Sequence, residues 1–176
     1  MIYGPYHYSD ALGAKSGHVP IIIPLAWFMM IYPSWRVAQA LLRGVDMRSI
    51  AGVTVRAVIT AVAMTGWDMV MDPGMARAGT GVWERGGPYF GVPLRNYLGW
   101  MATTFLIYWA VGWLWRRGEL RTSARGVFAA LPVIVYAFFA IRYMTPNEIP
   151  ALQMVAVFSM GMPGLLALVP ALVNEA

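Results

Sequence analysis

Residues 50–71 read IAGVTVRAVITAVAMTGWDMVM, an apolar run in which Arg56 and Asp68 are the only charged residues. About 20 apolar residues are enough for a helix to cross the hydrocarbon core of a bilayer. Further segments of this kind lie at residues 19–42, 94–115, 126–143 and 151–173. The sequence therefore predicts an all-α fold: an integral membrane helical bundle with about five transmembrane helices, in a single transmembrane domain over residues 1–176.

The composition supports a membrane location. Of the 176 residues, 59% are hydrophobic and 12% are charged, and the charged share is about half that of an ordinary soluble domain. So few charges cannot cover the surface of a water-soluble globule of this size. The chain is also far too apolar to be disordered. The composition therefore excludes a soluble single-domain enzyme and a disordered chain.

Several kinds of ligand are also excluded. The sequence has no cysteine and two histidines, so disulfides, zinc–thiolate sites and iron–sulfur clusters are ruled out. We expect no metal and no cofactor. The net charge of +5 could suggest nucleic acid, but the arginines lie between apolar segments, as topology determinants do. We therefore expect no nucleic-acid binding.

The positions of the cationic residues predict the orientation of the helices. One side of the membrane would hold Arg36, Arg43, Arg48, Arg56, Arg116, Arg117, Arg121 and Arg125. The other side would hold Lys15, Arg77, Arg85, Arg95 and Arg142. The first side is then cytoplasmic and includes the C-terminus, in a bacterial or archaeal plasma or intracytoplasmic membrane. Because a chain without a signal peptide does not easily begin outside, we expect further helices or a partner upstream.

Three polar groups occur at the ends of the predicted spans. Tyr6, His7, Tyr8 and Asp10 precede the first span, Asp68 and Asp72 end the second, and residues 83–96 (WERGGPYFGVPLRN) lead into the third. Alternation of the helices places all three groups at one end of the bundle. Ionisable residues within spans are costly and usually functional, so we expect a site there.

Asp68 and Asp72 are four residues apart and therefore share one face of a helix. Two neighbouring carboxylates in a medium of low dielectric constant cannot both ionise easily. One carboxyl would then stay protonated near neutral pH, as an acid for a weak base such as an alkene requires. In the alternative interpretation, Asp72 with Pro73 and Gly74 ends the helix in an interfacial turn.

His7 and Asp10 lie three residues apart in the N-terminal cluster. They could form an imidazole–carboxylate pair or a proton relay. Alternatively, His7 is a solvated histidine in an interfacial aromatic belt. We interpret Trp27 and its neighbours as packing residues, and Arg36 as an anchor whose charge extends toward water.

Three stretches show a family resemblance: residues 6–13 (YHYSDALG), 67–73 (WDMVMDP) and 87–100 (GPYFGVPLRNYLGW). Together they resemble the membrane carotenoid-biosynthesis hydratases, which include the γ-carotene 1′,2′-hydratases and the bisanhydrobacterioruberin hydratases. The resemblance covers most of residues 1–115. Members of that family carry hydrophobic helices before the Tyr-His-Tyr motif, which here begins at residue 6. We therefore expect a shortened homologue, a split gene product or a fragment.

The resemblance implies cofactor-independent addition of water to a terminal double bond of an acyclic carotenoid end group. Asp68 or Asp72 would protonate the alkene, and the other carboxylate or the His7–Asp10 pair would accept a proton from water. The aromatic rings would stabilise the carbocation and the asparagine would position water. The expected substrate-binding residues are Tyr8, Trp83, Tyr89, Asn96 and Trp100.

Two other functions fit the same residues. The chain could be a carotenoid-binding or structural subunit of a larger membrane pigment–protein complex, without catalysis. It could also be a small transporter or a proton-translocating subunit, because paired aspartates within spans suit proton relays. The expected partners are a carotenoid and membrane lipid.

Overall fold

The computed structural model describes residues 5–116, 127–145 and 149–173. Arg117, Arg121 and Arg125, which were counted for orientation, lie outside these residues. The long helices are α1 (Ile22–Leu41), α2 (Ile50–Arg77), α3 (Leu94–Trp115) and α4 (Val127–Met144). A fifth helix, Ala151–Val173, consists of α5 (Ala151–Ala156), a π-helical turn (Val157–Gly161) and α6 (Met162–Val173).

Helices dominate the described residues, and the expected helical membrane fold is confirmed. Three helices are long and apolar enough to cross a membrane by length and composition: α2, α4 and the fifth helix. The other two, α1 with 20 residues and α3 with 22 residues, each extend over about 30 Å at 1.5 Å per residue. Their length therefore matches the hydrocarbon thickness of a bilayer as well.

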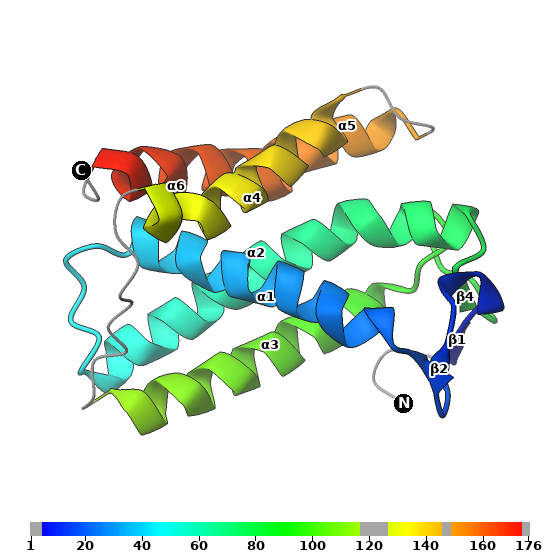
Figure 1. Ribbon diagram of the computed structural model, residues 1–176, viewed down its shortest axis with the longest axis horizontal. Coiled ribbons are helices and arrows are strands. Elements are labelled where there is room, and N and C mark those ends of the chain that lie inside the picture. Colours follow the sequence, from blue (N-terminus) through cyan, green and yellow to red (C-terminus); the bar gives the residue numbers. More distant parts are fainter. Residues whose placement is uncertain (1–4, 117–126, 146–148, 174–176) are drawn as a thin grey trace.

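The helices form layers, as Figure 1 shows: α4 and α6 cover α1 and α2, and α3 lies on the far side. The central helix α2 packs against both α1 and α3, whereas α1 also contacts α4 and α6. Large buried side chains fill the space between these helices. The rings of Trp67 and Tyr136 meet edge-to-face at 5.3 Å, and the Tyr136 hydroxyl donates a hydrogen bond to the Ala63 carbonyl at 2.9 Å.

The fifth helix comes very close to α2 at Gly66. A Cβ atom at this position would lie 2.5 Å from the carbonyl oxygen of Ser159, so only glycine permits the approach. That carbonyl lies in the π-helical turn four residues before Pro163, which has no N–H to donate to it. The Ser159 hydroxyl donates to the Gly66 carbonyl at 3.0 Å. Small residues at contacts between membrane helices allow this kind of packing.

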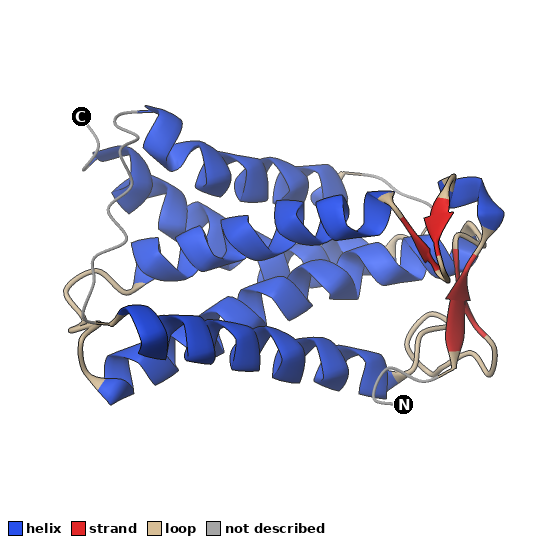
Figure 2. Cartoon of the chain, turned by 60° about the horizontal axis from the view of Figure 1, so that its bottom comes forward, coloured by secondary structure: helices blue, strands red, loops and turns tan. Residues whose placement is uncertain are grey.

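Short strands occur at one end of the bundle, beyond the ends of the helices (Figure 2). Strand β1 (Tyr6–Tyr8) pairs antiparallel with β4 (Gly81–Trp83), with Tyr6 opposite Trp83. A second pair joins β2 (Lys15–Ser16) and β3 (Val19–Pro20), and a single 3-10 turn, η1, covers Asp10–Leu12. These strands were not predicted from the sequence. The β1–β4 pair attaches the N-terminal segment to the connection between α2 and α3.

Candidate active site

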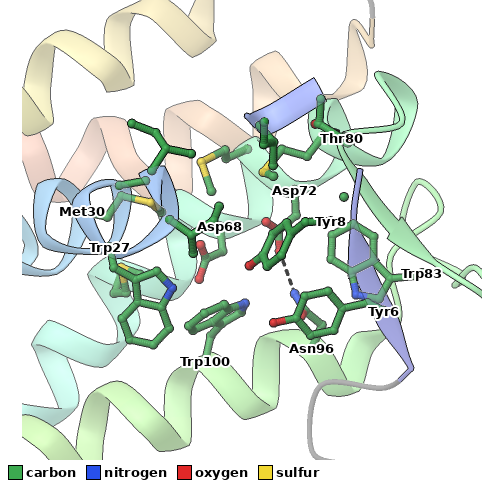
Figure 3. A pocket seen from close by; sticks show the side chains of 18 residues that line it. Tyr6, Tyr8, Trp27, Met30, Asp68, Asp72, Thr80, Trp83, Asn96 and Trp100 are labelled. Carbon is green, nitrogen blue, oxygen red and sulfur yellow. Dashed lines mark hydrogen bonds between the residues drawn. The ribbon is translucent and has the colours of Figure 1, made fainter. Parts of the chain in front are cut away.

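A cavity of about 240 Å³ lies between α1, α2 and α3 and is bordered by β1 and β4. Its wall is mostly apolar and includes four methionines: Met30, Met64, Met71 and Met75. Five aromatic residues also line it: Tyr6, Tyr8, Trp27, Trp83 and Trp100. The polar side chains in the wall include two carboxyls and one amide, those of Asp68, Asp72 and Asn96. Figure 3 shows these polar groups among the aromatic rings.

The two carboxyl groups differ in their surroundings although both are buried on α2. The Asn96 amide donates a hydrogen bond from Nδ2 to Oδ2 of Asp72 at 2.6 Å, drawn as a dashed line in Figure 3. In contrast, Oδ2 of Asp68 is buried and has no hydrogen-bond partner among the described residues. One carboxyl is therefore held in place, whereas the other keeps a free oxygen at the cavity.

Asp72 lies within a helix because α2 continues through Pro73 to Arg77. The interpretation that Asp72 ends the helix in an interfacial turn is therefore wrong. A proline removes the hydrogen bond to the carbonyl four residues earlier, which here belongs to Met69. The Tyr89 hydroxyl donates to that carbonyl at 3.0 Å and replaces the lost donor. Asp72 thus stays one helical turn from Asp68, on the same face.

The loop before α3 is tightly folded and places Tyr89 and Asn96. A Cβ atom at Gly87 would overlap the carbonyl carbon of Val92, so the close approach requires glycine. Within the loop, the Val92 N–H donates to the Tyr89 carbonyl at 2.9 Å. The loop ends at Pro93, which precedes α3, so Asn96 lies in the first turn of that helix, facing Asp72.

Two pairs of aromatic rings form much of the cavity wall. Tyr6 on β1 stacks on Trp83 of β4 at a ring distance of 6.1 Å, and Trp27 of α1 lies 4.3 Å from Trp100 of α3. A second, more open hollow of about 470 Å³ lies beside the cavity, and Trp27, Trp100, Tyr6 and Tyr8 border both spaces. The cavity therefore adjoins the protein surface along its aromatic wall.

Of the two interpretations of His7, the pair with Asp10 is wrong and the solvated histidine fits the structure. Side chains alternate between the two faces of a strand, so Tyr6 and Tyr8 line the cavity while His7 points away. The His7 side chain is 59% exposed, with Nδ1 4.0 Å from Glu84. The Asp10 side chain is 99% exposed and accepts a hydrogen bond from Lys15 at 2.7 Å. This hydrogen bond holds the pKa of Asp10 below its usual value.

The other expected site residues divide into two groups. The cavity wall contains Asp68, Asp72, Tyr8, Trp83, Asn96 and Trp100. Tyr89 does not line the cavity; its hydroxyl donates a hydrogen bond to the Met69 carbonyl of α2. Burial raises the pKa of the Tyr89 phenol. Burial also raises the pKa of the Tyr8 phenol, so Tyr8 remains a hydrogen-bond donor. No three His, Asp or Glu side chains of the described residues gather as a metal site would need.

Two aromatic residues of the wall, Tyr6 and Trp27, were not among the expected substrate-binding residues. Tyr6 could have been found from the alternation of Tyr6, His7 and Tyr8, had residues 6–8 been recognised as a strand. Trp27, interpreted from the sequence as a packing residue, borders the cavity opposite Trp100. No local pattern marks it, because Trp27 and Trp100 are brought together only when α1 and α3 pack on α2.

Comparisons with known proteins agree with the resemblance seen in the sequence. Residues 1–164 match the model of a family described as carotenoid biosynthesis protein. A bisanhydrobacterioruberin hydratase of Haloarcula japonica is 31% identical over 100 residues, which cover 56% of this chain and 32% of that protein. The match thus spans about a third of the relative's length. No solved structure matches the chain. Since the family model covers most of the sequence, the chain belongs to the carotenoid biosynthesis protein family.

Proposed function

We propose that the chain is a carotenoid hydratase that adds water to a terminal double bond of an acyclic carotenoid end group. The observation that carries this proposal is the pair of buried carboxyls, with unlike hydrogen bonding, at an otherwise apolar and aromatic cavity. Its volume of about 240 Å³ is below the roughly 300–1,000 Å³ of pockets that enclose drug-sized ligands. It suits the end of a long polyene, whose remainder would lie along the more open hollow.

Asp68 is the proton donor in this proposal. In a buried site beside a second carboxyl, one of the two stays protonated, and Asp68 is the one without a hydrogen bond to its Oδ2. Its proton is transferred to the CH carbon of the trisubstituted terminal alkene. The electron pair of the double bond forms the new C–H bond, which leaves a tertiary carbocation at the neighbouring carbon.

The aromatic wall stabilises this cation. A desolvated cation over the face of an aromatic ring gains about 2 kcal/mol or more, with tryptophan the most effective. Trp27 and Trp100 lie together on one part of the wall, and Trp83 is stacked with Tyr6 on another. These rings also exclude water from all but the polar part of the cavity, which limits side reactions of the cation.

Asp72 is the proton acceptor. As the oxygen of water bonds to the cationic carbon, one O–H bond breaks and its proton passes to Asp72, which the Asn96 amide holds in position. Transfer of that proton to Asp68, one helical turn away, restores the starting state. The net reaction is addition of one water to the alkene, which yields a tertiary alcohol. Trp83, whose buried Nε1 has no partner among the described residues, is a donor available to the water.

A second candidate is carotenoid binding without turnover, within a larger pigment–protein assembly. The largely apolar lining of the cavity supports it, because such a wall would hold a polyene end whether or not the carboxyls react. The two functions differ in what they require of Asp68. Hydration requires the carboxyl proton of Asp68, whereas binding requires only a side chain of similar size at that position.

The test is expression of the chain in a lycopene-accumulating bacterial host, followed by mass spectrometry of the extracted pigments. We expect a gain of one or two waters per carotenoid, with the polyene absorption unchanged because the terminal double bonds lie outside the conjugated system. Asp68→Asn keeps the shape of the side chain and should abolish the gain. Pigment that co-purifies with the protein but gains no water would favour the binding function instead.

A further inference from the structure

The end of the bundle opposite the cavity is strongly basic. Here lie the C-terminus of α1, the N-termini of α2 and α4, and the C-termini of α3 and α6 (Figure 1). The cationic residues of this end within the described ranges are Arg36, Arg43, Arg48, Arg56 and Arg116. Its only carboxylate among the described residues is Asp46, which accepts a hydrogen bond from the Arg48 backbone N–H. This end therefore attracts anions.

A separate pocket of about 170 Å³ opens at this end, between α1, α4 and α6. Its lining includes Arg36 and Gln39 of α1, Arg43 in the turn after that helix, Val133 of α4 and Ala171 of α6. The volume is far more than the roughly 10–15 Å³ that admits one water molecule. The pocket shares no residue with the candidate active site and lies at the opposite end of the bundle.

The guanidinium of Arg36 is fixed at this pocket. It donates one hydrogen bond to Oε1 of Gln39 and another to the Ala129 carbonyl at the start of α4, each at 2.9 Å. Its Nε is buried and has no hydrogen-bond partner among the described residues. No carboxylate of the described residues forms an ion pair with Arg36 or Arg43. The pocket thus holds two positive charges, of which that of Arg36 is fixed by hydrogen bonds, and no carboxylate of the described residues pairs with either.

We propose that Arg36 and Arg43 bind a phosphate group in this pocket. A guanidinium matches the geometry of phosphate oxygens and forms charge-assisted hydrogen bonds with them. A phosphate oxygen would satisfy the buried Nε of Arg36, which otherwise bears the cost of an unpaired polar group. It would also offset two positive charges held close together.

The phosphate could come from two sources, the headgroup of an anionic membrane lipid or a free phosphate. The site lies at the ends of helices that cross the bilayer, which is the depth of lipid headgroups. Basic pockets between transmembrane helices bind such headgroups. Exposed apolar side chains flank the pocket on the same helices: Phe128 and Leu131 of α4 and Leu172 of α6. They would contact the acyl chains of a bound lipid.

Binding to the purified full chain in a neutral detergent tests the proposal, without carotenoid. The probes are phosphatidylglycerol, a diacylglycerol with the same acyl chains, and inorganic phosphate, with native mass spectrometry as the readout. We expect phosphatidylglycerol to bind and diacylglycerol not to bind. Inorganic phosphate that competes would identify free phosphate as a ligand, and lack of competition would identify the lipid headgroup. Both results support a phosphate site.

The variants locate the site. Arg43→Gln, at an exposed residue of the pocket, should weaken binding of the successful phosphate probe by about tenfold, the effect of losing one charge-assisted contact. Arg36→Gln should weaken it at least as much, and Arg85→Gln, at an exposed arginine of the opposite end, should have no effect. Arg43→Gln is decisive because it leaves the buried hydrogen bonds of Arg36 intact. The proposal is overturned if Arg43→Gln leaves binding unchanged. It is also overturned if phosphatidylglycerol and diacylglycerol bind equally well and inorganic phosphate does not bind.

Discussion

The hydrogen bond from Tyr89 to α2 should stabilise the helix because Pro73 lies inside it. Tyr89→Phe removes the hydroxyl that reaches the Met69 carbonyl at 3.0 Å and leaves that carbonyl without its donor. An unsatisfied buried polar group costs about 1–3 kcal/mol. Since Met69 and Tyr89 are both partly exposed, we expect a loss of about 1–2 kcal/mol in the free energy of unfolding.

A double-mutant cycle with Pro73→Ala separates this effect from general loss of packing. Alanine at this position restores the backbone N–H that the Met69 carbonyl lacks. In that background, Tyr89→Phe should cost less than about 0.5 kcal/mol, which corresponds to a coupling energy of about 1 kcal/mol. The free energy of unfolding can be measured by reversible denaturation in mixed micelles. If the two substitutions are additive within about 0.3–0.5 kcal/mol, the Tyr89 hydroxyl does not replace the donor missing at Pro73, and the explanation is wrong.

The remaining predictions concern the cavity and the helix contacts. Asp68→Asn should lower turnover by about 10²–10⁴-fold, the usual contribution of a general acid. The folded variant should still retain carotenoid when it is purified. Near-normal turnover of the variant would show that another residue is the proton donor. His7→Ala should leave turnover unchanged in the same pigment assay, because the imidazole lies outside the cavity wall. A large loss of turnover would show that His7 takes part in the reaction. Gly66→Ala should destabilise the chain by about 1–3 kcal/mol, a typical cost of overpacking, because the new Cβ would lie 2.5 Å from the Ser159 carbonyl oxygen. The matched control is Gly74→Ala, also within α2, where a Cβ meets nothing within 4 Å; equal destabilisation of both variants in mixed micelles would contradict the close approach.

Local sequence patterns determined the helical membrane fold and one part of the site. The apolar runs predict helices because only a helix satisfies its own backbone hydrogen bonds in a bilayer. The spacing of Asp68 and Asp72 places both carboxyls on one face of α2, and this follows from helix geometry alone. The motif at residues 87–100 indicated the family, and the tight loop before α3 explains two of its glycines, Gly87 by a close backbone approach and Gly91 by its positive φ.

Only the tertiary structure decided how the groups of the site are paired. Asn96 meets Asp72 across 24 residues of sequence, and His7 turns away from the cavity because residues 6–8 form a strand with β4. Helix α2 passes Pro73 with a donor supplied by Tyr89, so a local rule that predicts a helix end does not apply. Side-chain identity and spacing set which groups are available. Which of them meet depends on contacts between distant segments, because a buried polar group costs free energy unless a partner such as Asn96 offsets that cost.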